Sequence, residues 1–363
     1  MVSVSELIES SLPLNLWDKL MVEYKNKNVI VTGGASFIGS NLVDLLISLG
    51  ANVKVLDDLS SGTISNLSQL DKIEFIECDL RSREATLDKF HGIDIVFHLA
   101  AVHGGRGFIE TYKQEMLVNL AIDNNVFSEG VKNKVKMMVH ASSACAYPIT
   151  LQEDEKDRHL LEEFEASMDS PETSFADGVY GWTKLIGEYQ LQNHSSTNGM
   201  RGRSARIFTA YGERENESHA AIALIAKALL GADPYPIWGN GEQTRNFTHV
   251  ADTALGLLFL GSDKSDLAFD AFNIGTSDHV KVIDFVQEIF RQLNWNPIKF
   301  DFQLDKPTGV ASRASNNKKI RDAFGWEPSI GIDVGIQRTI AWYKSLPSRP
   351  KNLAELEERL SAR

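Results

Sequence analysis

The sequence predicts an α/β protein with a doubly wound parallel sheet and a smaller, interleaved C-terminal domain. Three observations favour this fold. Short apolar runs alternate with helix-length segments from residue 28 onward, a glycine-rich turn follows the first run, and after residue 208 the elements become shorter and are punctuated by glycine and proline. Strands that alternate with helices are typical of a parallel sheet covered on both faces.

Seven apolar segments are predicted to form the sheet. The first helix places its leucines on one face between Ile38 and Leu49, and Gly50 is expected to end it. The last strand lies beyond the sixth by about 60 residues and is predicted to rejoin the same sheet. The predicted strands are 28–32, 53–57, 73–77, 93–98, 135–140, 202–208 and 271–275.

Because the last strand returns to the sheet, the two predicted domains are interleaved in sequence. The larger comprises residues 27–205 with about 248–276, and the smaller comprises 206–247 with 277–346. Residues 1–26 are interpreted as an arm packed on the main body, and 347–363 as a charged helical tail. The acidic segment 149–177 is interpreted as a lid or a local excursion, since loops of this length are usually functional.

The composition excludes several kinds of partner. The chain of 363 residues carries a net charge of −12, which opposes broad attraction to nucleic acid or anionic membranes. An anionic substrate would therefore need a few locally placed arginines or lysines. Two cysteines are too few for a disulfide framework, no segment approaches a membrane span, and the first residues lack the basic stretch of a secretory signal. We expect a cytoplasmic protein without a metal site.

The turn at residues 32–39 predicts a dinucleotide site in a Rossmann-type domain. Gly33 and Gly39 lie six residues apart with Gly34 beside them, as required where backbone N–H groups at a helix N-terminus approach a pyrophosphate. Ser36 occupies the place where the related pattern has its middle glycine. A glycine-rich turn alone is weak evidence, but its position between a strand and a helix strengthens it.

Asp57 indicates which dinucleotide is bound. It ends the second strand, at about the spacing from Gly33 where a carboxylate accepts hydrogen bonds from an adenosine ribose. A carboxylate there repels a 2′-phosphate, and residues 58–62 contain no arginine to reverse this. NAD is therefore predicted in preference to NADP. A solvated strand end remains the alternative interpretation of Asp57.

Ser143, Tyr180 and Lys184 form a candidate catalytic set. Tyr180 and Lys184 are four residues apart and hence on one face of a helix. The ordinary tyrosine pKa is about 10, so a lysine and a positively charged nicotinamide are needed to bring it towards neutrality for base catalysis. Ser143 ends the fifth strand, where its hydroxyl can orient a substrate alcohol.

With these residues in this order, the chain resembles the extended short-chain dehydrogenase/reductases of the sugar-nucleotide epimerase and dehydratase class. The likeness runs from about residue 28 to 345 and includes 98–101 and 243–247. Within that class, three stretches most resemble GDP-mannose 3,5-epimerases, namely 104–109, 141–148 and 309–316.

The resemblance implies an isomerase that acts on a nucleotide-diphosphate sugar through a transient 4-keto intermediate, and that forms a homodimer through helices flanking the sheet. It assigns substrate contacts to Gly104, Gly105 and Arg106 in addition to Ser143. The cofactor contacts that it implies, beyond the three glycines and Asp57, are Ser36, Phe37, Ile38, Asp58, Asp79, Leu80, Leu99, Ala100, Ala101, Tyr180 and Lys184.

Cys145 is a candidate acid/base residue. A 4-epimerase needs only hydride transfer at C4, whereas a 3,5-epimerase must also move protons at C3 and C5. Cys145 follows Ser143 by two residues and so lies on the same side of an extended segment. A thiol becomes a usable base when a nearby cation lowers its pKa. A small buried hydrophobe is the alternative role for this residue.

Three further residues are assigned through the resemblance. His219 stands where the resembled family has a lysine, and histidine can donate a proton near neutrality; the alternative is a solvent-facing histidine at a helix start. Arg245 and Arg313 resemble residues that clamp the diphosphate, since a guanidinium binds phosphate oxygens bidentately. The alternative for each is a solvated or ion-paired arginine.

Other activities remain to be compared with a 3,5-epimerase. A 4,6-dehydratase is disfavoured because such enzymes carry an Asp-Glu pair where this chain has Ala144 and Cys145. A 4-epimerase is the main rival, since Ser143, Tyr180 and Lys184 suffice for it. An NAD-binding regulatory protein without turnover is opposed by the intact tyrosine and lysine.

Overall fold

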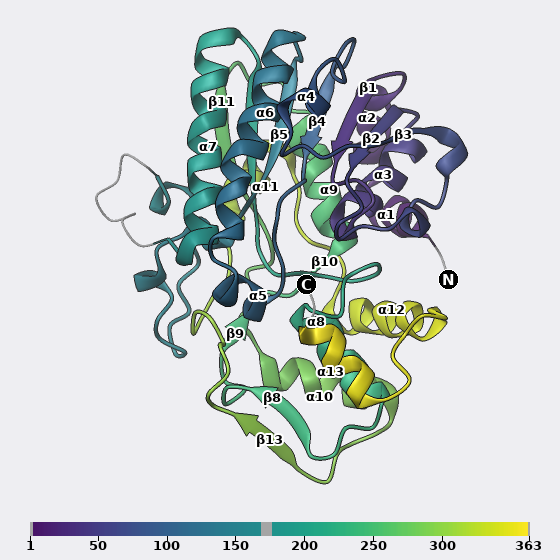
Figure 1. Cartoon of the computed structure of the whole chain (residues 1–363), viewed down its shortest axis with the longest axis vertical. Helices are drawn as coiled ribbons and strands as arrows, with labels where there is room; N and C mark the ends of the chain where they lie inside the picture. The colour runs from purple at the N-terminus through teal and green to yellow at the C-terminus, as the bar shows by residue number, and fades with distance from the viewer. Residues whose placement is uncertain (1–2, 168–175, 362–363) are drawn as a thin grey trace.

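The computed structural model describes residues 3–167 and 176–361. Residues 168–175 of the acidic segment, and the extreme ends of the N-terminal arm and the C-terminal tail, lie outside the described residues. The large sheet occupies the upper part of the molecule in Figure 1, and a smaller group of helices and short strands lies below it.

The central sheet has seven parallel strands in the order β11-β6-β5-β4-β1-β2-β3. The six N-terminal strands follow the Rossmann order. β11 rejoins the sheet as predicted, and the structure shows that it pairs with β6. The fold class is confirmed. The predicted apolar run 135–140 is only part of β5, which the structure continues to Ser143, the residue expected at its end. The strands are β1 (Asn28–Thr32), β2 (Asn52–Asp57), β3 (Ile73–Glu77), β4 (Ile95–His98), β5 (Met137–Ser143), β6 (Arg201–Ile207) and β11 (Phe269–Ile274).

Alternation along the strands builds two separate cores. Val29 and Val31 of β1 face one hydrophobic cluster, whereas Ile30 faces another on the opposite side of the sheet. This follows from the two-residue period of a strand. The first cluster is covered by α3 (Phe37–Ser48) and α9 (Val250–Gly261), the second by α6 (Asn119–Lys132) and α7 (Gly178–Asn198). α3 ends as predicted, with Gly50 at φ +78°.

The N-terminal arm belongs to the first core. α1 (Val4–Ser11) starts with a capping box, and α2 (Leu14–Tyr24) follows it. Ile8, Trp17 and Tyr24 are buried in the cluster with α3 and α9, and the Tyr24 hydroxyl donates a 2.6 Å hydrogen bond to the Leu258 carbonyl. Burying an apolar side chain of this size contributes about 1.5–3 kcal/mol, so the arm stabilises this side of the sheet.

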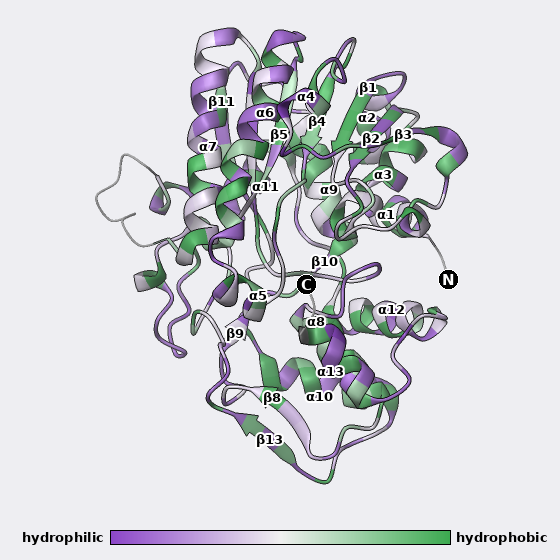
Figure 2. Cartoon of the chain, in the orientation of Figure 1, coloured by the Kyte–Doolittle hydropathy of each residue, from purple (hydrophilic) through white to green (hydrophobic). Residues whose placement is uncertain are grey.

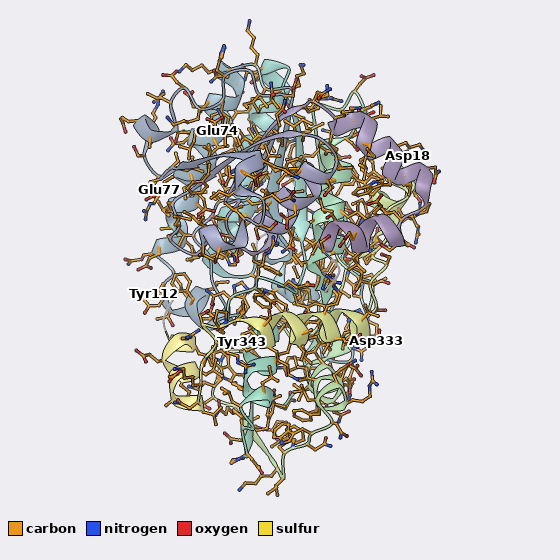
Figure 3. All side chains as sticks on the ribbon, turned by 90° about the vertical axis from the view of Figure 1, so that its right-hand side faces the viewer. Asp18, Glu74, Glu77, Tyr112, Asp333 and Tyr343 are labelled. Atoms are coloured by element: carbon orange, nitrogen blue, oxygen red, sulfur yellow. The ribbon has the colours of Figure 1, made fainter. Side chains whose placement is uncertain are left out.

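A third core lies below the sheet. Here Tyr211 and Tyr235 pack with aromatic and aliphatic side chains of α8 and α10. Figure 2 shows α8 as strongly hydrophobic, in keeping with its burial, and Figure 3 shows α12 crossing the molecule beneath the sheet with Asp333 and Tyr343 along it. The helices are α8 (Ala220–Leu229), α10 (Val282–Leu293), α12 (Ile332–Ser345) and α13 (Leu353–Ser361).

Short elements connect the large sheet with the lower part. Three two-stranded pairs, β7 with β10, β9 with β12, and β8 with β13, lie outside the large sheet. No helix in the described part of the chain is long and apolar enough to cross a bilayer. The remaining elements are β7 (Ala210–Tyr211), β8 (Tyr235–Trp238), β9 (Thr244–Arg245), β10 (Thr248–His249), β12 (Val280–Lys281), β13 (Phe300–Gln303), α4 (Arg83–Thr86), α5 (Arg106–Thr111) and α11 (Lys318–Phe324).

Candidate active site

A cavity of about 320 Å³ opens at the carboxyl ends of the strands. This is the edge of a doubly wound sheet where ligands bind. Most of the residues predicted from sequence line it. They are Gly33, Ser36, Phe37, Ile38, Gly39, Asp57, Asp58, Asp79, Leu80, Leu99, Ala100, Ala101, Ser143, Cys145, Tyr180, Lys184, His219 and Arg313.

The glycine turn is shaped by close backbone contacts. Gly33 has φ +67°, and a Cβ there would lie 2.9 Å from the Ala100 nitrogen. A Cβ on Gly39 would collide with the Gly33 carbonyl oxygen, so only glycine lets α3 start this close to β1. The side chain of Ser36, the N-cap residue of α3, makes no capping hydrogen bond with the first turn of this helix. Its first N–H groups therefore suit a pyrophosphate, as the dinucleotide prediction requires.

Gly34 and Ser36 have different positions in this turn. Gly34 does not line the cavity; a Cβ there would lie 2.8 Å from the Val55 side chain, so its role is to pack the turn against β2. The Ser36 hydroxyl lies 3.4 Å from that of Ser61, and both residues line the cavity. Ser36 thus adds a polar group to the wall at the start of α3.

Asp57 is buried at the end of β2, with 4% of its surface exposed, so it is not a solvated strand end. Its carboxylate accepts hydrogen bonds from the Ala35 and Leu59 nitrogens, at 2.9 and 2.8 Å. Burial raises the pKa of this carboxyl, and the two N–H groups oppose that effect. The side chain is thereby held in one orientation at the cavity wall.

Arg81 also lines this wall, although residues 58–62 alone predicted no arginine near Asp57. It follows β3, which pairs with β2, so the strand order could have indicated it. Its guanidinium binds Asp79 at 2.8 and 3.0 Å and lies 3.7 Å from Asp58. Two aspartates therefore compensate its charge, which leaves it poorly placed to attract a 2′-phosphate.

Ser143, Tyr180 and Lys184 meet where β5 faces α7. The Ser143 hydroxyl hydrogen-bonds with the Tyr180 phenol and accepts from the Cys145 nitrogen at 3.1 Å. The Lys184 ammonium donates to the Ala141 carbonyl at 2.7 Å and lies 5.8 Å from the centre of the Tyr180 ring. Burial raises the pKa of Tyr180 and lowers that of Lys184, so a further positive charge is needed to make the phenol a base.

A buried polar network lies beneath Lys184. Asp123 accepts from His98 at 3.0 Å and has His140 3.6 Å away, and the other His98 nitrogen lies 2.7 Å from the Thr32 hydroxyl. Burial opposes the Asp123 charge, but His140 and His98 keep the pKa of this carboxyl below its ordinary value. The carboxylate thus provides a negative charge beneath a buried ammonium.

Cys145 lies in the short helical turn Ala144–Ala146, against the start of α7. A Cβ on Gly181 would collide with the Cys145 carbonyl oxygen, which explains how closely the two segments approach. A guanidinium nitrogen of Arg313 donates to the Cys145 sulfur at 3.5 Å. The thiol is partly exposed in the cavity wall beside a cation, and it is not a buried hydrophobe.

His219 caps α8 and faces the cavity rather than open solvent. One of its ring nitrogens lies 3.3 Å from the Glu215 carboxyl, and burial lowers the pKa of His219 to about 4. Its ring centre is 5.1 Å from that of His103, which also lines the cavity. Sequence reasoning missed His103, although it immediately precedes the glycine pair 104–105.

Arginines form a charged cluster next to Cys145. Asp177 binds Arg106 at 2.9 and 3.0 Å and Arg313 at 2.9 Å. Arg245 donates to the Thr308 carbonyl at 2.7 Å. Burial, Arg313 and Arg106 together lower the pKa of Arg245 to about 9. Three guanidinium groups in one buried cluster suit an anion such as a diphosphate.

Four predicted substrate-binding residues stand just behind the cavity wall. Arg106 and Arg245 do not line the cavity directly, and neither do Gly104 and Gly105. A Cβ on Gly105 would collide with the Ser218 carbonyl oxygen. This glycine therefore brings the segment after β4 against the loop that carries His219. Asp177, which orients two of the arginines, was not predicted.

Comparison with known proteins gives consistent results. A family model described as the NAD dependent epimerase/dehydratase family matches residues 29–275. GDP-mannose 3,5-epimerase of Arabidopsis thaliana is 29% identical over 333 residues, covering 90% of this chain and 85% of its own. A putative UDP-glucose 4-epimerase of Methanocaldococcus jannaschii is 30% identical over 327 residues, covering 87% and 98%.

A solved structure extends the likeness to nearly the whole chain. An epimerase from Methanothermobacter thermautotrophicus superimposes with a TM-score of 0.81 at 26% identity, covering 96% of this chain and 99% of that one. The matched part is thus longer than residues 29–275, which the family model covers.

Proposed function

Because the chain belongs to the NAD-dependent epimerase/dehydratase family, we propose that it epimerises a nucleotide-diphosphate sugar through a transient 4-keto intermediate, in a reaction like that of a GDP-mannose 3,5-epimerase. The single observation that carries the finer proposal is the contact between the Arg313 guanidinium and the Cys145 sulfur, next to Ser143 and Tyr180. A 4-epimerase needs no such group.

Oxidation at C4 is assigned to Ser143, Tyr180 and Lys184. NAD, when bound, supplies the acceptor that takes a hydride from the sugar and returns it. Tyr180 removes the hydroxyl proton, Ser143 orients that hydroxyl through its bond with the phenol, and Lys184 places a positive charge behind the ring. The cavity wall from Gly33 to Gly39 with Asp57 is the part proposed to hold the cofactor.

Proton exchange at C3 or C5 is assigned to Cys145 and His219. The 4-keto group makes the neighbouring C–H protons removable, so a base on one face and an acid on the other suffice to invert the carbon. The Arg313 guanidinium donates a hydrogen bond to the Cys145 sulfur, so a positive charge lies directly beside the proposed base. His219 belongs to a separate segment, at the start of α8.

The diphosphate is assigned to the arginine cluster. Arg313 reaches the cavity directly, and Arg106 and Arg245 stand behind it. The cluster supplies the local positive charge that an anionic substrate needs in a protein with a net charge of −12. The small part, residues 206–247 with 277–346, is proposed as the substrate domain because it supplies Arg245 and Arg313.

The decisive experiment is incubation with NAD and candidate nucleotide sugars in deuterated water. Deuterium at C3 or C5 supports the proposal. A C4 epimer without deuterium contradicts it and supports a 4-epimerase, the activity in the name of one relative. Bound NAD without turnover of any sugar would favour a regulatory protein.

The substitution Cys145→Ser tests the thiol itself. It keeps the shape of the side chain but replaces the thiol with a weaker acid, so proton exchange at C3 or C5 should fall strongly while C4 oxidation continues.

The proposed assembly is a homodimer in the cytoplasm. Tyr189 of α7 and Leu117 just before α6 are 45% and 52% exposed, which gives the sheet-flanking helices apolar surface for a second copy. Light scattering of the purified protein tests this, with a monomer at micromolar concentration as the contradicting result.

A further inference from the structure

Two histidines face each other in the wall of the cavity, and only one of them was assigned a role from sequence. The His103 and His219 ring centres are 5.1 Å apart at an angle of 34°. The Tyr180 ring centre lies 6.2 Å from that of His103. His103 therefore lies near both the phenol proposed to act at C4 and the imidazole proposed to act at a neighbouring carbon.

The pair is held by the backbone around it. Gly105 brings the segment after β4 against the Ser218 carbonyl, at a distance that any larger residue would prevent. Glu215 lies 3.3 Å from one His219 ring nitrogen and accepts a hydrogen bond from the Gly212 nitrogen. Glu215 is thus a positioning residue. Because it lies beside one ring nitrogen of His219, the other ring nitrogen is turned away from it.

The two rings differ in their access to water. His103 is exposed, whereas the His219 side chain is only 20% exposed. Burial lowers the pKa of His219 to about 4, so at neutral pH it does not hold a second proton of its own. The exposed side chain of His103 is open to solvent, with which a histidine can exchange a proton.

We propose that His103 is a further acid/base residue of this site, which delivers solvent protons to the sugar carbon as one unit with His219. The inference rests on the proposed function. The proposed proton transfers balance. A base on one face of the sugar removes the proton from carbon and leaves an enolate. An imidazolium N–H of the histidine pair then donates the proton that forms the new C–H bond. Solvent then restores the proton through His103, and the first base releases one, so no proton is consumed.

The test measures exchange relative to oxidation in the NAD-loaded protein. Deuterium gained at C3 or C5 is divided by the amount of C4 oxidation for the unaltered protein, His103→Gln and His219→Gln. We expect the ratio to fall at least about tenfold in each variant, within the usual range for a lost acid/base group. Since the two act as one unit, the double variant should lose little more than either single variant.

His91→Gln is the matched control, because His91 is exposed and does not line the cavity; its ratio should match that of the unaltered protein. The inference about His103 would be overturned if His103→Gln kept the exchange-to-oxidation ratio of the unaltered protein. It would also be overturned if the double variant lost the product of the two single losses. Neither result would contradict the proposed function. Absence of exchange in the unaltered protein contradicts the proposed function and this inference with it. If His103→Gln fails to retain NAD, His103→Asn replaces it with the same criterion.

Discussion

The two halves of the cavity are built in different ways. In the cofactor half, the wall comes mainly from short segments at the ends of adjacent strands, and its key contacts are made by backbone atoms and glycines. In the sugar half, charged and titratable side chains from distant segments meet, among them Cys145, Asp177, His219 and Arg313. The first half therefore depends on backbone shape, and the second on the balance of charges.

We expect the largest loss of activity at Tyr180, where the cofactor half and the sugar half of the cavity join. Tyr180→Phe removes the proposed base but leaves the ring, so C4 oxidation should fall about 10²- to 10⁴-fold while NAD stays bound. The measurement is single-turnover formation of reduced nicotinamide. Tyr189→Phe, on the same helix but 45% exposed, is the control and should keep its rate. Retention of the full rate by Tyr180→Phe would remove the phenol from the chemistry.

Gly39→Ala tests the dependence of the cofactor half on backbone shape. The new methyl group would collide with the Gly33 carbonyl, so we expect most of the bound NAD to be lost, as measured in the released-nucleotide fraction. Gly50→Ala is the control, since a Cβ there meets nothing closer than 3.7 Å and the residue lies beyond the other end of the same helix. Its strained φ should cost about 1 kcal/mol of stability but no cofactor.

Arg313→Lys tests whether the sugar half depends on geometry as well as charge. The guanidinium contacts Gln152, Cys145 and Asp177 through three different nitrogens, which an ammonium cannot reproduce. We expect the KM for the nucleotide sugar to rise about tenfold, and carbon exchange to fall further. Arg291→Lys, in an exposed ion pair on α10, should change neither. An unaltered KM would show that positive charge alone is enough.

The smallest effect is expected at Ser36. Ser36→Gly restores the residue type that the related pattern has. Among the described residues, the one side-chain hydrogen bond that this change removes is the 3.4 Å contact between the Ser36 and Ser61 hydroxyls. NAD content should change by less than about twofold, since an exposed hydrogen bond contributes little. A large gain in NAD retention would instead mean that this side chain weakens the cofactor half.

The degree to which sequence reasoning succeeded differs between the halves. The seven strands, the turn and Asp57 follow from local periodicity and from spacing within one βαβ unit. Arg81 was missed because its approach to Asp58 depends on β3 pairing with β2, not on the residues next to Asp57. Asp177 was missed because its partners lie 71 and 136 residues away along the chain.

By itself, the sequence determined the sheet, its order of elements and the cofactor turn, because apolar period and glycine placement act between neighbouring residues. It also led to the prediction that Ser143, Tyr180 and Lys184 carry chemistry, and the structure places all three in the wall of one cavity. Only the tertiary structure decided that Arg313 contacts Cys145, that Asp177 joins two arginines, and that His103 faces His219. The physical reason is that hydrogen bonds and charge interactions act over a few ångströms in space, whatever the distance along the chain.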